Sequence, residues 1–344
     1  MNNADRMKWV DIAKGVSIIL VVMMYAVYNV GRHTGSVGFL HYVIAFATPF
    51  RMPEFFLISG LFLSAGIERP WRRYVDRRFV HYMYFYVLWA FIMIALKVGV
   101  FARDPVAMAA DLASAIVQPY GVLWFVYMLG VFAIAAKLLW QFRVPHWLVI
   151  AVATGLQIVP INVSSYIVTQ FSAYFLFFYI GYAFAPQIFR MAGWVAENQK
   201  KAIAALGIWF VVNGLLVFLP SFELLPAETR MGYAAFPPLH IMLGVAGAIA
   251  LCAFSVVLMG RRYTGWLRWI GEHSLVIYLA FTIPMSIFRE IMMSSGLIAQ
   301  TGPLSLAVFL VALIAPIMLY LAINWTGYGR FLFVRAEWAR IRPE

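Results

Sequence analysis

The chain has 344 residues, of which 64% are hydrophobic, 17% aromatic and only 12% charged. Soluble domains carry about 25% charged residues, so this composition excludes an ordinary water-soluble fold and indicates a membrane protein. The formal net charge of +12 does not indicate a nucleic-acid partner, because the basic residues lie in short loops between apolar segments.

The apolar segments predict an all-α polytopic membrane bundle in a single domain, 1–344. Lipid admits only helices or closed barrels, and these runs have the length of helices. We expect the first run to be a membrane helix and not a cleaved signal, since it contains Asp11 and Lys14 and continues to about Val30. Hydropathy predicts ten spans, at 9–30, 40–66, 79–101, 122–142, 145–162, 166–187, 202–220, 237–259, 268–288 and 303–325.

The distribution of Lys and Arg predicts that both chain ends are cytoplasmic. With ten spans and a cytoplasmic N-terminus, twenty of the 26 basic residues fall on the cytoplasmic side, five on the opposite side, and Arg51 within a span. Such an excess is the usual orientation signal of membrane proteins. The five residues on the opposite side are Arg32, Lys97, Arg103, Arg230 and Arg289.

The first span carries polar groups on one face. Asp11 and Lys14 are three residues apart, so they can form an ion pair. Tyr25 lies eleven residues beyond Lys14, which returns it to nearly the same face about 16 Å further along the helix. The stripe is either functional, as buried ionisable groups often are, or an interfacial ion pair beside an ordinary aromatic residue.

The second span contains the sequence PFRMPEFFLISG, residues 49–60. Pro49 and Pro53 each remove an amide donor, and Pro53 suits the first turn of a new half-helix. Arg51 beside such a helix start is a candidate site for an anion or a developing oxyanion. The alternative is a structural pair between Arg51 and Glu54 that fixes a kink.

The most basic segment is ERPWRRYVDRRFVHY, residues 68–82. Arginine side chains bind phosphates in a bidentate manner, and Trp71 and Tyr74 can stack on a base. The segment fits a cytoplasmic nucleotide-bearing cofactor and equally well the headgroups of anionic membrane lipids. Its arginines are Arg69, Arg72, Arg73, Arg77 and Arg78.

The ninth span contains WIGEHSLVIYL, residues 269–279. His273 is a candidate general base, but adjacent residues of a helix do not face each other, so Glu272 is not expected to orient it. The alternative is a polar cap at the membrane interface. The single cysteine, Cys252, and the scattered histidines give no metal-binding pattern.

Four of these segments together resemble acyltransferase family 3. The segments are WVDIAKGVSIILVVMMY (9–25), RMPEFFLISGLFL (51–63), RRYVDRRFVHY (72–82) and IGEHSLVIYL (270–279). The family includes O-acetyltransferases of bacterial surface sugars and succinyl-transferring glucan-modifying enzymes. The resemblance implies transfer of an acyl group, commonly acetyl from acetyl-CoA, to a hydroxyl of a carbohydrate or glycolipid acceptor, by a multi-pass protein of the bacterial inner membrane.

The resemblance also implies roles for individual residues. The arginines from Arg69 to Arg78 would hold the CoA phosphates, and the stripe of Asp11, Lys14 and Tyr25 would line the route to the transfer point. Arg51 would stabilise the oxyanion, and Glu54 would hold Arg51.

At one position the chain departs from the family pattern. In the first helix the pattern is a basic residue, ten intervening residues and a histidine, and the histidine position falls on Tyr25. A phenol is a poor base near neutral pH. Three interpretations remain open: His41 or His33 supplies the base; Tyr25 acts through hydrogen bonds; or the chain is a catalytically weak relative. A transporter or flippase of a lipid-linked or anionic substrate, or a non-catalytic partner in polysaccharide assembly, are the alternative functions.

Overall fold

A computed structural model describes residues 3–159, 163 and 165–341, and nearly all regular structure in these ranges is helical. The predicted all-α membrane bundle is therefore confirmed in its class. Many side chains on the outside of the bundle are large and apolar, as lipid contact requires. The helices of 18 or more residues are α1 (Asn3–Thr34), α7 (Trp124–Gln141), α9 (Tyr166–Ala183), α11 (Gln199–Phe218), α12 (Pro237–Met259) and α16 (Thr301–Thr326).

Shorter helices connect and complete these. They are α2 (Leu40–Ala47), α3 (Arg51–Leu61), α4 (Trp71–Val75), α5 (His81–Ile94), α6 (Pro105–Val117), α8 (His146–Ile158), α10 (Ala185–Glu197), α13 (Gly265–Glu272), α14 (Ser274–Ala280) and α15 (Thr282–Ser295). The π-helical segments are η1 (Asp76–Val80) and η2 (Ala95–Phe101), and the 3₁₀ turns are η3 (Gly121–Leu123), η4 (Tyr233–Ala235), η5 (Arg262–Thr264), η6 (Arg330–Leu332) and η7 (Glu337–Ala339).

Within the described residues, six continuous helical stretches are long and apolar enough to cross a membrane: Lys8–Thr34, Trp71–Val100, Pro105–Gln141, Gln199–Phe218, Pro237–Met259 and Thr301–Thr326. The number rises to eight if two bent pairs each form one span: α9 with α10, bent by 72°, and α14 with α15, bent by 51°. The chain is therefore a multi-pass membrane protein, whereas the count of ten and the cytoplasmic position of the ends stay predictions. In the described part of the predicted span 145–162, the helix is the 13-residue α8.

The predicted span 40–66 is broken into two helices. α2 ends at Ala47 and α3 begins at Arg51. Pro49 has no amide hydrogen to continue the first helix, and Pro53 lies in the first turn of the second, where helix amides have no partner within the helix. The sequence-based prediction of a new half-helix at this place is confirmed.

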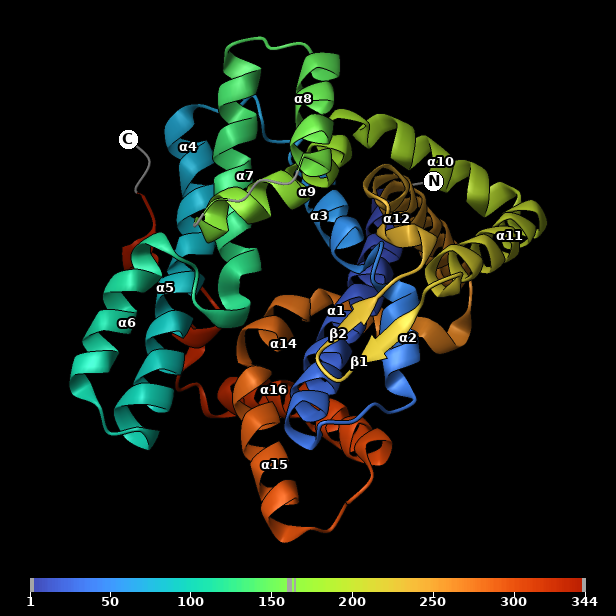
Figure 1. The fold of residues 1–344 in the computed structure, drawn as a ribbon. Helices are drawn as coiled ribbons and strands as arrows, with labels where there is room; N and C mark the ends of the chain where they lie inside the picture. The colour runs from blue at the N-terminus through green and yellow to red at the C-terminus, as the bar shows by residue number, and fades with distance from the viewer. Residues whose placement is uncertain (1–2, 160–162, 164, 342–344) are drawn as a thin grey trace.

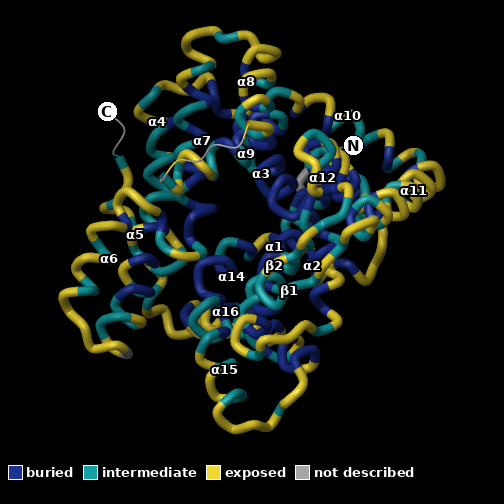
Figure 2. Tube along the Cα trace, viewed as in Figure 1, coloured by how far each residue is buried: buried dark blue, intermediate teal, exposed yellow. Residues whose placement is uncertain are grey.

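Helix α1 lies at the centre of the bundle, with α6 and α11 on opposite sides of the molecule (Figure 1). It packs directly against α3, α12, α13 and α16. The contact with α13 is close, because a Cβ at Gly271 would lie 1.6 Å from the carbonyl oxygen of Asp11. The burial colours follow the same arrangement, with buried segments near the centre and exposed ones on α6, α8, α11 and α15 (Figure 2).

One small sheet was not expected from the sequence. β1 (Glu223–Leu225) and β2 (Glu228–Arg230) form an antiparallel hairpin, with Leu224 opposite Thr229. The hairpin contacts the centre of the bundle, since Thr229 bonds the hydroxyl of Tyr28 on α1 at 2.9 Å. Strands of three residues are too short to give an alternating pattern, which explains why the segment resembles a loop in sequence.

Candidate functional site

Arg51 is the most unusual polar residue inside the bundle. Only 7% of it is exposed, and its Nε and Nη1 atoms have no hydrogen-bond partner among the described residues. It occupies the first position of α3, directly after the break that the two prolines create. A buried charged donor without a partner costs free energy, so such groups usually face a functional ligand.

Three tyrosines lie within electrostatic range of Arg51. They are Tyr25 and Tyr28 of α1 and Tyr174 of α9. We call Tyr25, Tyr28, Arg51 and Tyr174 the arginine–tyrosine cluster. It brings together one cation and three hydroxyl groups from three helices, which is a suitable environment for an oxyanion.

Tyr25 is held at the edge of this cluster. The indole Nε1 of Trp124 donates a hydrogen bond of 3.2 Å to its hydroxyl, and its ring packs against Phe281 at 5.4 Å between centroids. Its outer side lines a cavity of about 600 Å³, which we call the first cavity. Tyr25 therefore lies between Arg51 and open space.

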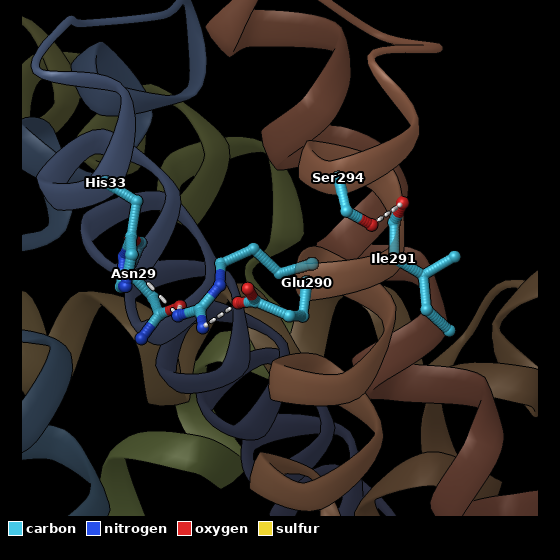
Figure 3. Close-up of polar contacts among 6 residues, drawn as sticks. Asn29, His33, Glu290, Ile291 and Ser294 are labelled. Carbon is cyan, nitrogen blue, oxygen red and sulfur yellow. Dashed lines mark hydrogen bonds and ion pairs between the residues drawn. The ribbon is translucent and has the colours of Figure 1, made fainter.

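The first cavity lies between α1, α6, α15 and the segment around η2. A polar contact near it joins α1 to α15: Arg289 donates to the Oδ1 of Asn29 and forms an ion pair of 3.1 Å with Glu290. In Figure 3, Asn29 and His33 lie opposite Glu290. The polar residues lining the cavity include Asn29, Arg32, Lys97, Asp111, Thr282 and Ser286.

Lys14 and Asp11 lie apart from this cluster. They form the predicted ion pair, at 3.2 Å, and Lys14 Nζ lies 5.1 Å from the centre of the Phe62 ring at the end of α3. Arg78 donates a hydrogen bond to the carbonyl oxygen of Phe62. We call Asp11, Lys14, Phe62 and Arg78 the lysine cluster. Lys14 thus lies beside the end of α3, whereas Tyr25, about 16 Å away along α1, is within electrostatic range of its first residue.

Glu54 does not hold Arg51, contrary to the sequence-based expectation. The two side chains form no ion pair, although both lie in the described part of the chain. Glu54 is fully buried, and one of its oxygens accepts a hydrogen bond from Ser17 of α1 while the other has no partner. Glu54 therefore faces α1 between the two clusters, because the packing of α3 on α1 places it beside Ser17.

The basic segment forms an exposed corner of the protein. Arg69, Arg72, Arg73 and Arg77 are exposed, whereas Arg78 turns inward to the lysine cluster. Lys137 supports the segment from α7 by donating to the carbonyls of Ile67, at 2.5 Å, and Arg69, at 3.1 Å. This geometry leaves an arginine-rich surface next to Lys14, and binding of CoA phosphates there stays a prediction.

His41 and His33, the histidines named as possible bases, differ in whether a ring nitrogen is free to accept a proton. The Nδ1 atom of His41 accepts from the amide of Gly38, at 3.0 Å, so its Nε2 carries the hydrogen and donates to the carbonyl of Pro226, at 3.3 Å. Both nitrogens of His41 are therefore occupied. His33 donates from Nδ1 to the carbonyl of Asn29, at 2.7 Å, which leaves Nε2 free, but the residue is exposed.

Glu272 and His273 do not form a catalytic pair, as the helix geometry predicts. Glu272 forms an exposed ion pair with Arg268, at 3.3 Å. His273 donates from Nδ1 to the carbonyl of Trp269, at 2.8 Å, and its ring packs against Tyr320. Their positions favour the interpretation as a polar cap.

Sequence reasoning missed Tyr28, Tyr174, Trp124 and Ser17. These residues come from apolar, aromatic-rich helices, and no spacing or charge distinguishes them from core residues. Only the packing of α1, α3, α7 and α9 brings them to Arg51 and Glu54. Within the described ranges, no group of three or more His, Cys, Asp or Glu side chains is arranged to hold a metal ion.

Comparison with known proteins gives one family and no individual relative. Neither a curated protein nor a solved structure matches the chain. The model of the acyltransferase domain called acyltransferase family 3 matches residues 7–323, and these include the lysine cluster, the arginine–tyrosine cluster and the basic segment. Because this match covers nearly the whole sequence, the chain belongs to acyltransferase family 3.

Proposed function

We propose that this protein moves an acyl group, acetyl in the simplest case, from acyl-CoA to a hydroxyl group of a carbohydrate or glycolipid. Membership of the acyltransferase family supports the reaction class. The observation that carries the proposal is Arg51, a buried guanidinium group with two unpartnered nitrogens and three tyrosines within electrostatic range. In acyl transfer, charge develops on the carbonyl oxygen, and fixed donors at that point stabilise the transition state.

The lysine cluster and the basic segment fit the donor side of this reaction. In our proposal this end of α1 faces the cytoplasm, as the distribution of basic residues predicts. Exposed arginines hold the CoA phosphates, and the pantetheine arm extends past Lys14 toward Arg51. The distance of about 16 Å between Lys14 and Tyr25 then separates binding of the nucleotide from the chemical step.

Arg51 and Tyr25 act at the transfer point in this mechanism. Arg51 donates to the thioester oxygen as it becomes negative, and the hydroxyl of Tyr25, oriented by Trp124, adds a second donor. The acceptor oxygen attacks the acyl carbon, its proton leaves to a base, and the carbon–sulfur bond breaks to release CoA. Glu54 supports the position of α3 against α1 through Ser17.

The proposal is tested in inverted membrane vesicles, which expose the cytoplasmic face to added acetyl-CoA. Radiolabelled acetyl groups are expected to enter the glycan fraction of vesicles with the protein and not of vesicles without it. Mass spectrometry of surface glycans then identifies the acyl group and the modified sugar from the mass difference. Vesicles that incorporate no more label with the protein than without it contradict the proposal.

Transport is the competing function, and the broken and bent helices of the structure favour it. Besides the broken α2–α3 segment, the pairs α9–α10 and α14–α15 are sharply bent, and interrupted helices often form substrate sites in transporters. The sequence alone indicated only one clearly broken span. Uptake of an unmodified glycolipid into vesicles, with no new ester, would decide for transport.

A further inference from the structure

The departure at Tyr25 raises the question of which group removes the acceptor proton, and a residue outside the sequence-based candidates answers it. His240 lies in the first turn of α12. Its Nδ1 lies 3.2 Å from the carbonyl oxygen of Ala234. Since a carbonyl only accepts, Nδ1 carries the hydrogen, and the neutral ring keeps its lone pair on Nε2. Within the described part of the chain, Nε2 has no hydrogen-bond partner.

The face of α12 that carries His240 packs against the break before Arg51. A Cβ at Gly244 would lie 3.2 Å from the carbonyl oxygen of Pro49, and a Cβ at Gly247 only 2.3 Å from Cβ of Phe50. Glycine at these positions allows α12 to approach the break this closely. His240 is four residues before Gly244, so it lies on the same face and about 6 Å further along the helix.

Two adjoining cavities connect His240 to the arginine–tyrosine cluster. One, of about 300 Å³, is lined by Pro53, Tyr174, Gln157 and His240. The other, of about 650 Å³, is lined by Gln157 and His240 again, and extends to Thr229 beside the hairpin. Because two residues are common to both, we treat them together as the second cavity. The second cavity therefore reaches Tyr174 of the arginine–tyrosine cluster, and Pro53, on the same helix as Arg51, also lines it.

The polar groups of the second cavity suit a neutral hydroxylated molecule. The side-chain oxygen of Gln157 is buried and has no hydrogen-bond partner, so it can accept from a substrate hydroxyl. The arginine of the cavity, Arg230, is already paired with Glu223, at 3.1 Å, and Glu228, at 3.7 Å. The first cavity differs, since Arg32, Lys97 and Asp111 line it.

We propose that the acceptor binds in the second cavity and that His240 is the general base of the transfer. This inference rests on the proposed acyl-transfer function. The proton of the acceptor hydroxyl passes to Nε2 of His240 while its oxygen bonds to the acyl carbon at Arg51. The carbon–sulfur bond then breaks, and the CoA thiolate receives the proton from the imidazolium ring. No further reactant is needed.

The decisive variant is His240→Gln, assayed in the inverted membrane vesicles with radiolabelled acetyl-CoA. General bases contribute about 10²- to 10⁴-fold, so the initial rate should fall at least 100-fold. His33→Gln is the matched control, because His33 also has a free Nε2 but lies near the first cavity, and it should keep at least half of the rate. Unchanged transfer by His240→Gln, or a comparable loss in His33→Gln, overturns the inference. If wild-type vesicles incorporate no label, the proposed function fails instead.

Two further measurements separate chemistry from folding. Tyr25→His in the His240→Gln background places an imidazole where the family pattern has histidine. This double variant should transfer at least tenfold faster than His240→Gln alone. An equal rate would contradict the inference that His240→Gln removes a general base. Diethyl pyrocarbonate modification of the purified protein, read by mass spectrometry, should label His240 and spare His41, whose nitrogens are occupied. The modification experiment does not depend on transferase activity. An unlabelled His240 in the folded protein also overturns the inference.

Discussion

The two ends of the α1–α3 contact carry different kinds of polar group. At the lysine cluster, Lys14 and Asp11 are paired and partly exposed, with 27% and 14% of their side chains accessible. At the arginine–tyrosine cluster, Arg51 is buried and two of its nitrogens are unpartnered. A partly exposed ion pair is screened by solvent and contributes little to stability, whereas a buried unpaired cation is costly. In the proposed mechanism the first end binds the acyl donor and the second carries out the chemistry.

The first and largest expected effect is at Arg51. Arg51→Ala removes the proposed oxyanion donor and should reduce the saturated rate of acetyl transfer about 10²- to 10³-fold. The rate is measured in inverted membrane vesicles at matched protein levels. Arg190→Ala, an exposed arginine on α10, serves as the control and should leave the rate unchanged. If Arg51→Ala transfers at the wild-type rate, the two ends do not differ in the way proposed.

A second prediction concerns the residues between the clusters. Among the described residues, Ser17 is the only hydrogen-bond partner of the buried Glu54 carboxyl group, so Ser17→Ala should lower the free energy of unfolding by about 1–3 kcal/mol. Denaturant titration of the detergent-solubilised protein measures this. Ser255→Ala is a matched control, because Ser255 is also buried on a helix but bonds only the carbonyl of Leu251, at 2.8 Å. Equal effects of the two variants would show that the Ser17–Glu54 contact adds nothing.

A third, smaller effect is expected at the lysine cluster. Lys14→Ala should raise the KM for acyl-CoA about tenfold, equivalent to about 1.4 kcal/mol, with little change in the saturated rate. Because the Asp11–Lys14 pair is partly exposed, protein stability should change by less than about 1 kcal/mol. The exposed Lys200 provides the control variant, Lys200→Ala. A fall in the saturated rate with unchanged KM would place Lys14 in the chemical step.

The smallest expected effect is at Tyr25. Tyr25→Phe keeps the ring against Phe281 but removes the hydroxyl that Trp124 orients. A single hydrogen bond contributes about 1 kcal/mol, so transfer should fall about fivefold. Steady-state kinetics of this variant are compared with those of Tyr320→Phe, whose hydroxyl lies outside the cluster. A loss as large as that of Arg51→Ala would make Tyr25 an essential group.

Features with a local physical cause were predictable from the sequence. The proline pair at Pro49 and Pro53 predicts the break and the start of α3, since neither residue can donate a backbone hydrogen bond. The three-residue spacing of Asp11 and Lys14 predicts their ion pair. The family was also recognisable, because its segments are continuous in sequence.

The partners of these groups depend on the tertiary structure. The spacing of Arg51 and Glu54 was compatible with a pair, but packing of α3 on α1 gives Glu54 to Ser17 and leaves Arg51 among tyrosines. His240 lies 189 positions beyond Arg51 in a loop-to-helix junction with no motif, and only the glycine face of α12 brings it to the break. Hydropathy and helical spacing describe one segment at a time, whereas a site built from α1, α3, α9 and α12 requires the contacts between them.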